Sequence, residues 1–105
     1  GLAISQVVPY PWSEVEPVAR DYRQLAERAK VDIGYLSFEG YVNALVMIES
    51  LRRAGRDLTR ARLHAALKAM KLRIAGMELD FTGASNTGSR FIEMVRVTKE
   101  GRFLR

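Results

Sequence analysis

The sequence predicts an α/β fold in which one strand leads into three consecutive helices and further strands close the chain. The uncharged apolar run from Leu2 to Val8 contains β-branched residues and is typical of a strand that is covered on both faces. Three stretches with helical spacing of their apolar residues follow it. Apolar and acidic residues then alternate from Met77 to Phe81, which indicates a half-exposed strand. A strand that feeds directly into a helix is the elementary unit of an α/β sheet.

Prolines and a capping motif mark the boundary between the first strand and the first helix. Pro9 and Pro11 lack the N–H group that a strand ladder needs, so the strand is expected to end before them. Ser13 stands three residues before Glu16, which is the spacing of a capping box. The first helix is therefore predicted from about Glu14 to Ala29.

Two further helices follow from capping residues and apolar spacing. Ser37 is the expected N-cap of the second helix, and Gly55 stands at its C-terminal end. The third helix is predicted from Arg60 to Met70, with Thr59 as its N-cap. The second helix is so rich in apolar residues that we expect it to be buried on more than one side. Its main apolar stripe is predicted to be Tyr41, Ala44, Leu45, Ile48 and Leu51, and Val42, Val46 and Met47 widen it.

The last quarter of the chain is predicted to form strands and turns. A polar loop from Thr82 to Ser89 follows the strand that ends at Phe81, and Phe91 to Val97 forms the next predicted strand. Lys99 to Gly101 is a turn signal, so Phe103 and Leu104 are expected to pair back as a hairpin.

Composition limits the chain to one small globular unit without covalent cross-links. Of the 105 residues, 48% are hydrophobic and 28% are charged, which is ordinary for a globular chain. There is no cysteine, so neither a disulfide nor a thiolate metal site is possible. No apolar run approaches the roughly 20 residues that a membrane-spanning helix needs.

The positive charge of the chain raises the hypothesis of a nucleic-acid partner. Seventeen basic and twelve acidic residues give a net charge of +5. Arg52 and Arg53 are explained without a ligand, because cations offset the dipole at a helix C-terminus. Arg56, Arg60 and Arg62 alternate with aliphatic residues and not with aromatic residues that stack on bases. We therefore expect no nucleic-acid partner, and a small basic interaction domain that binds nucleic acid is the alternative function.

The residues that carry catalysis in other proteins occur here without partners. His64 is the only histidine, and no nucleophile elbow, phosphate-binding glycine loop or metal-ligand spacing occurs in the sequence. The sequence therefore predicts a protein that is not an enzyme, with no catalytic residues, no metal site and no cofactor.

Two groups of residues are candidates for ligand binding. Glu39 lies in the first turn of an apolar helix beside Tyr35, so its carboxylate can hold an ammonium group with aromatic faces nearby. Alternatively, Glu39 offsets the helix dipole and the aromatic residues belong to the core. Gln6 and the following turn, which contains Tyr10, are candidates for a cleft rim, because ligands of open α/β sheets bind beyond the strand ends. Alternatively, Gln6 is a hydrogen-bonded strand residue.

Four segments in one order carry a resemblance to a known family. These segments are ISQVVPYPW, YLSFEGYVNALVMIESLRRAG, LTRARLHAALKAM and GSRFIEMVRVTKEGRF. In this order they resemble the last third of an ABC-transporter substrate-binding protein of the leucine/isoleucine/valine-binding type, which has the type I periplasmic binding fold. The family often has a histidine before the loop glycine, where this chain has Asn86 and Thr87 before Gly88.

The resemblance implies a fold, a function and a location. It implies a partial lobe of a two-lobe protein that traps an amino acid or a related small carboxylate between its lobes. An ABC permease would be the protein partner, and the location would be periplasmic or extracellular. The resemblance places Val8 and Pro9 near the hinge, and it places Thr82 and Gly83 near the strand that crosses back between the lobes.

Residues 1–105 are expected to form a single piece of such a protein. The first strand begins the chain directly and has no partner strand before it. Leu2–Val8 and Phe91–Val97 both need cover from neighbouring elements. We therefore expect the isolated chain to self-associate, because uncovered strands pair readily with a second copy.

Overall fold

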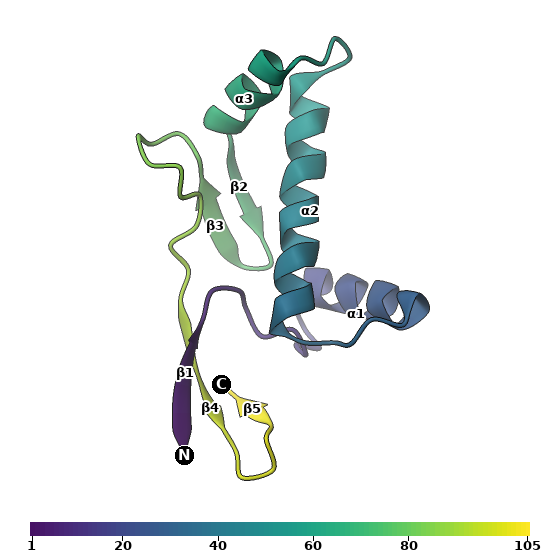
Figure 1. Cartoon of the computed structure of the whole chain (residues 1–105), viewed down its shortest axis with the longest axis vertical. Coiled ribbons are helices and arrows are strands. Elements are labelled where there is room, and N and C mark those ends of the chain that lie inside the picture. Colours follow the sequence, from purple (N-terminus) through teal and green to yellow (C-terminus); the bar gives the residue numbers. More distant parts are fainter.

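The computed structural model describes residues 1–105 as three helices and two small antiparallel sheets (Figure 1). None of the helices is both long enough and apolar enough to cross a membrane. The elements in chain order are β1 (Leu2–Gln6), α1 (Pro17–Ala29), α2 (Tyr35–Ala54), α3 (Arg60–Lys68), β2 (Lys71–Ile74), β3 (Met77–Asp80), β4 (Glu93–Val97) and β5 (Phe103–Leu104).

The first sheet joins the two ends of the chain in the order β1-β4-β5. Leu2 pairs with Val97, and Gln6 pairs with Glu93. The predicted terminal hairpin is confirmed, because β5 pairs antiparallel with β4, and Gly101 in the turn adopts a positive φ of 75°. The prediction of a first strand buried on both faces is wrong: β1 ends at Gln6, and Leu2 is 65% exposed. The reason is that no helix and no second sheet packs extensively on the faces of β1, whose extensive contacts are with β4 alone.

The second sheet is a hairpin of β2 and β3. Ala75 and Gly76 both have a positive φ, which is the two-residue turn that suits the twist of a hairpin. In β3 the predicted alternation is confirmed, because Met77 is buried and Glu78 is exposed. Strand β2 was not predicted from the sequence, since its turn has Ala-Gly where Asn-Gly or Asp-Gly would give a stronger signal.

The helix starts differ from the predicted ones, whereas other caps are confirmed. Helix α1 begins at Pro17 and not near Glu14, because the Glu16 carboxylate caps it by accepting the Val18 N–H. Ser13 accepts the Glu16 N–H at 3.2 Å and so stabilises the turn before the helix. Helix α2 begins at Tyr35, two residues before the predicted Ser37 cap. The predicted caps Gly55 and Thr59 are confirmed for α2 and α3, and α3 ends at Lys68, two residues before Met70.

The core lies between α1, α2 and the β2–β3 hairpin. The rings of Tyr22 and Phe38 lie 4.8 Å apart at its centre. The predicted stripe of α2 is rotated from the observed one, because Ile48 is 60% exposed while Phe38 and Val42 are buried. The expectation that α2 is buried on more than one side is also wrong for this chain, since Met47 is half exposed. The buried hydrophobic cluster consists of Val8, Ala19, Tyr22, Ala26, Phe38, Val42, Ile74, Ala75, Met77 and Leu79.

Two connecting segments join the first sheet to the helices and the hairpin (Figure 1). Residues 7–16 run from β1 to α1, and residues 81–92 run from β3 back to β4. Leu79 forms a bridge with Ser89, and the Asp80 N–H donates to the Gly88 carbonyl at 2.8 Å. The second connecting segment is therefore fixed to the edge of β3 before it reaches the first sheet.

Candidate functional site

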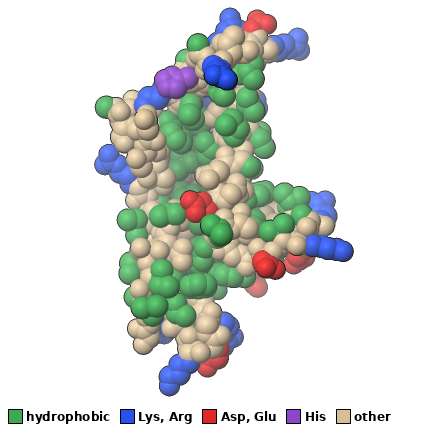
Figure 2. Space-filling model, in the orientation of Figure 1, with side chains coloured by type: hydrophobic (Ala, Val, Ile, Leu, Met, Phe, Trp, Pro, Cys, Tyr) green, Lys and Arg blue, Asp and Glu red, His purple; other side chains and the backbone are tan.

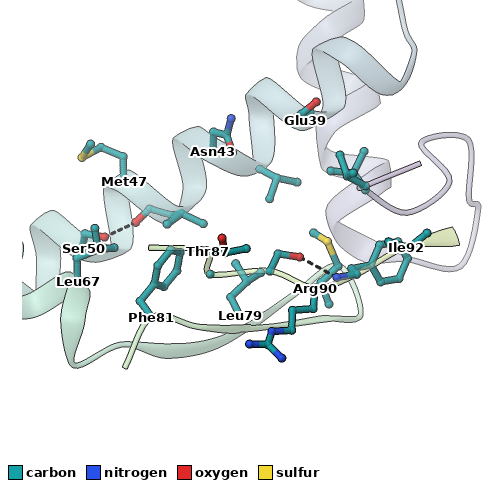
Figure 3. Close-up of a pocket in the computed structure, with 18 of the residues that line it drawn as sticks. Glu39, Asn43, Met47, Ser50, Leu67, Leu79, Phe81, Thr87, Arg90 and Ile92 are labelled. Carbon is teal, nitrogen blue, oxygen red and sulfur yellow. Dashed lines mark hydrogen bonds between the residues drawn. The ribbon is translucent and has the colours of Figure 1, made fainter. Parts of the chain in front are cut away.

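A groove of about 800 Å³ runs between α2, α3, β3 and both connecting segments (Figure 3). Hydrophobic side chains make up most of its lining, and Figure 2 shows such side chains gathered in a hollow of the surface. The hydrophobic residues of the groove include Val8, Val42, Val46, Met47, Leu63, Leu67, Leu79, Phe81, Phe91 and Ile92.

Two of the polar side chains of the groove are bonded within the chain, whereas Glu39, Asn43, Thr87 and Arg90 make no side-chain hydrogen bond. The Ser50 hydroxyl donates to the Val46 carbonyl at 2.7 Å, and the Ser89 hydroxyl accepts the Phe91 N–H at 3.2 Å. Glu39 and Arg90 lie on opposite sides, and the guanidinium of Arg90 is directed away from Glu39 (Figure 3). The groove therefore offers apolar contact and no matched pair of charges for an amino acid.

A second feature, the aromatic cluster of Tyr10, Trp12, Tyr35 and Phe103, joins the first sheet to α2. The ring of Trp12 lies 5.2 Å from that of Tyr10 and 5.7 Å from that of Tyr35. The ring of Phe103 lies 5.3 Å from Tyr35 and 6.1 Å from Trp12. The guanidinium of Arg105 lies over the Tyr10 ring, 5.1 Å from its centre. Such contacts are favourable beyond the area that they bury.

Two polar atoms beside the aromatic cluster are buried without a hydrogen-bond partner. They are the Tyr35 hydroxyl on α2 and Oε1 of Glu93 on β4. Burial is the main cause that raises the pKa of Tyr35 to about 12; the charges of Glu93 and Tyr10 act in the same direction, and Arg105 opposes them. Tyr35 is therefore a neutral phenol throughout the physiological range.

The raised pKa of Tyr35 predicts that the folded protein loses stability at alkaline pH. Its phenol ionises near pH 10 in the unfolded chain but only near pH 12 in the folded chain. Between these values the unfolded state releases a proton that the folded state keeps, so stability falls as the pH rises. We expect Tyr35→Phe to reduce this fall, measured by urea denaturation at several pH values from 8 to 12. An identical pH profile for both proteins would contradict the assignment.

The predicted ligand residues divide between these two features. Glu39 lines the groove, whereas Tyr10 and Tyr35 belong to the aromatic cluster. Gln6 lies at the end of β1, paired with Glu93. The structure thus brings Gln6, Tyr10 and Tyr35 to the region where the first sheet meets α2.

The predicted hinge residues lie near the start of each connecting segment, Val8 and Pro9 after β1 and Thr82 and Gly83 after β3. Val8 is buried and lines the groove, and Pro9 follows it in the first segment. The Thr82 N–H donates to the Asp80 carboxylate at 2.8 Å, and the Gly83 carbonyl accepts Nζ of Lys68 at 2.7 Å. Thr82 and Gly83 therefore lie against α3 rather than beside the first sheet.

The residue that fixes the first connecting segment, Arg23, was not predicted from the sequence. Nη1 of Arg23 on α1 donates to the carbonyls of Pro11 and Ser13, at 2.8 and 2.7 Å. A single arginine in an amphipathic helix gives no signal of such a distant contact. Because this segment carries Tyr10 and Trp12, Arg23 positions part of the aromatic cluster.

We expect Arg23→Met to destabilise the protein. The change keeps much of the aliphatic chain but removes two charge-assisted hydrogen bonds to part-buried carbonyls, at a cost of roughly 1.5–3 kcal/mol. Arg20→Met is the matched control, since Arg20 is exposed on the same helix. Urea denaturation measures both variants, and equal losses would show that the carbonyl contacts contribute nothing.

Two of the exposed arginines, Arg52 and Arg53, are paired with a carboxylate within α2. Glu49 accepts hydrogen bonds from Arg52 and Arg53, which lower its pKa to about 2. These pairs occupy two of the cations on which the nucleic-acid hypothesis depends. His64 is exposed on α3, and no group of three or more His, Asp or Glu side chains is placed to hold a metal ion.

Comparison with known proteins finds structural matches alone. No protein-family model and no curated protein matches the chain. A substrate-binding periplasmic protein from Ralstonia solanacearum matches 97% of the chain with a TM-score of 0.82 and 31% identity. An extracellular ligand-binding receptor from Verminephrobacter eiseniae matches 98% with a TM-score of 0.82 and 27% identity. A possible leucine/isoleucine/valine-binding protein from Rhodopirellula baltica shares the fold over 100% of the chain, with a TM-score of 0.81 and 22% identity.

These matches confirm the predicted fold class. The chain is an α/β unit with the fold of part of a periplasmic binding protein. It spans 30% of the length of each of the three matched structures. The first two matched proteins are described as a periplasmic substrate-binding protein and an extracellular ligand-binding receptor, which agrees with solute binding as the general function.

Proposed function

We propose that the chain is part of the solute-binding component of an ABC uptake system that binds an amino acid or a related small carboxylate between two lobes. The observation that carries this proposal is the likeness of nearly the whole chain to a periplasmic substrate-binding protein at 31% identity. The location would accordingly be periplasmic or extracellular, and the protein partner would be an ABC permease.

The architecture supports a division between two lobes. The chain has two separate sheets, and the only covalent links between them are residues 7–70 and residues 81–92. In this proposal β1, β4 and β5 belong to one lobe, and the helices with the hairpin belong to the other. Val8, Pro9, Thr82 and Gly83 would then lie in or near the segments that bend when the lobes close.

The proposed solute contacts lie where the two parts of the chain meet. Gln6, Tyr10 and Tyr35 converge on that region, and the Tyr35 hydroxyl is free to bond a polar group. Glu39 lies one helical turn after Tyr35 on α2, so its carboxylate would hold the ammonium group of an amino acid. The second lobe would supply the donors for the solute carboxylate.

A chimaera tests this function. In it, our chain replaces the matching 30% of the Ralstonia solanacearum protein, and amino acids and small carboxylates are screened by thermal shift. We expect at least one amino acid to stabilise both the chimaera and its parent. Glu39→Gln should abolish the shift in the chimaera, whereas Glu27→Gln on the exposed face of α1 should retain it. A folded chimaera that no solute stabilises, beside a parent that responds, would contradict the proposal.

We also propose that the isolated chain self-associates. Leu2 and Met94, on β1 and β4, are 65% and 60% exposed, and β1 has a free edge. Burying such side chains outweighs the screened repulsion between two copies of charge +5. Light scattering coupled to gel filtration checks this, and a monomer at millimolar concentration would contradict it.

A further inference from the structure

The positive charge of the chain is concentrated at one end of the molecule. Residues 49–68, which form the end of α2, the following loop and α3, contain six basic and two acidic residues, a net charge of +4. The other 85 residues contain eleven basic and ten acidic residues, a net charge of +1. We call this region the basic end, and its cations are Arg52, Arg53, Arg56, Arg60, Arg62 and Lys68.

The chain itself neutralises only part of the basic end. Its six cations share two carboxylates, those of Glu49 and Asp57. Nη1 of Arg62 lies 3.6 Å from the Asp57 carboxylate, and both side chains are largely exposed. Arg56 and Arg60 are exposed and form neither a hydrogen bond nor an ion pair through their side chains. The basic end therefore presents free positive charge to a partner.

The basic end is an extremity of the molecule and lies outside the groove. The loop between α2 and α3 stands at one end of the longest axis of the chain, which extends over 51 Å (Figure 1). Basic side chains are visible around this end (Figure 2). None of its six cations lines the groove, to which α3 contributes Leu63 and Leu67. A broad, flat partner can therefore reach the basic end without entering the groove.

We propose that the basic end docks on an anionic lipid surface. Clusters of about four to eight Lys and Arg residues on an amphipathic helix are typical of segments that bind anionic headgroups. Leu58, which is 50% exposed, stands between Arg56 and Arg60, and an apolar side chain beside cations enters the boundary between headgroups and acyl chains. Docking holds the chain at a membrane, which is where the proposed ABC permease resides.

A nucleic acid fits the basic end less well than a lipid surface does. No Phe, Tyr or Trp occurs between Tyr41 and Phe81, so no aromatic ring accompanies the cations to stack on bases. Attraction to a charged bilayer needs exposed cations alone, because it depends on the surface potential and not on stacking. The choice of lipid also rests on the periplasmic or extracellular location in the proposed function.

The test measures cosedimentation of the 105-residue chain, without any solute, with vesicles of equal parts phosphatidylcholine and phosphatidylglycerol. We expect binding about tenfold or more tighter than to pure phosphatidylcholine vesicles, and weaker binding as the salt concentration rises. A double variant, Arg56→Gln with Arg60→Gln, should weaken binding to the anionic vesicles by about tenfold or more. The reason is that each cation near an anionic bilayer strengthens binding about fivefold.

A second double variant, Arg20→Gln with Arg102→Gln, is the matched control. It removes the same charge from α1 and from the residue before β5, and both side chains are exposed. Because these positions lie outside the basic end, the control should change binding by no more than about threefold. Circular dichroism checks that both double variants keep their helices.

Three results would overturn the lipid-docking surface. Absent binding, or equal binding to neutral and anionic vesicles, would exclude a contact made by cations. Equal losses in the two double variants would assign the contact to net charge and not to the basic end. Displacement of the chain from the vesicles by a DNA duplex at equal phosphate concentration would make nucleic acid the partner. Because no solute is present, these failures leave the solute-binding proposal standing, and a chimaera that binds no solute leaves the lipid contact standing.

Discussion

Phe38→Ala is expected to unfold most of the protein. Phe38 is 0% exposed, and its ring packs 4.8 Å from that of Tyr22 at the centre of the core. Truncating such a buried ring typically costs about 3–5 kcal/mol, through lost apolar burial and the cavity that remains. A domain is stable by only about 5–15 kcal/mol. Because this chain buries only 15 of its 105 residues, the loss takes most of its stability.

The control for this prediction is Leu36→Ala on the same helix. Leu36 is 85% exposed, so its truncation should change stability by no more than about 0.5 kcal/mol. Urea denaturation followed by circular dichroism gives both values. A loss below about 1 kcal/mol for Phe38→Ala would show that the core between α1, α2 and the hairpin does not form as described.

Gly88→Ala is expected to have the next largest effect. A Cβ at residue 88 would stand 2.1 Å from Cε1 and 2.2 Å from Cζ of Phe81, far inside contact distance. Gly88 cannot retreat easily, because its carbonyl accepts the Asp80 N–H at 2.8 Å and Ser89 is bridged to Leu79. The Phe81 ring must therefore leave its place against the core, at a cost of roughly 1–3 kcal/mol.

Gly83→Ala in the same segment is the matched control. No atom lies within 4 Å of a Cβ at Gly83, and its φ is not in the left-handed region. The unfolding midpoint in urea should fall for Gly88→Ala and stay nearly unchanged for Gly83→Ala. Equal midpoints would show that Phe81 moves aside without loss. The prediction also explains a glycine at this position from packing alone.

Local chemistry made much of the fold predictable. The cap at Thr59, the glycine after α2 and the alternation of Met77, Glu78 and Leu79 all depend on neighbours within a few residues. Boundaries failed where two caps competed, as at Ser13 and Glu16, since the sequence holds both and only the fold decides between them.

Burial could not be predicted from the sequence with the same success. Apolar runs such as Leu2–Val8 indicate that a surface needs cover, but not that the cover lies within this chain. The same holds for α2, whose observed buried face contains Phe38, Val42 and Ser50. The polar Ser50 is buried because its hydroxyl bonds back to the Val46 carbonyl, which apolar periodicity cannot reveal.

The candidate site was predictable only in its individual residues. Glu39 was singled out by its helix position, and it does line the groove. The aromatic cluster depends on contacts between residues that lie far apart in the sequence: Trp12, Tyr35 and Phe103. The pairing of β1 with β4 and of β4 with β5 brings the two ends of the chain together, which apolar periodicity does not reveal.

Calorimetric titration of one amino acid into two proteins tests the central claim most directly. The amino acid is one that stabilises the parent protein from Ralstonia solanacearum, and the two proteins are the 105-residue chain and the chimaera that contains it. If the chain supplies only part of a two-lobe binding site, the chimaera binds with micromolar affinity and the chain alone releases no heat of binding. Micromolar binding to the chain alone, or no binding to a folded chimaera, would contradict the account.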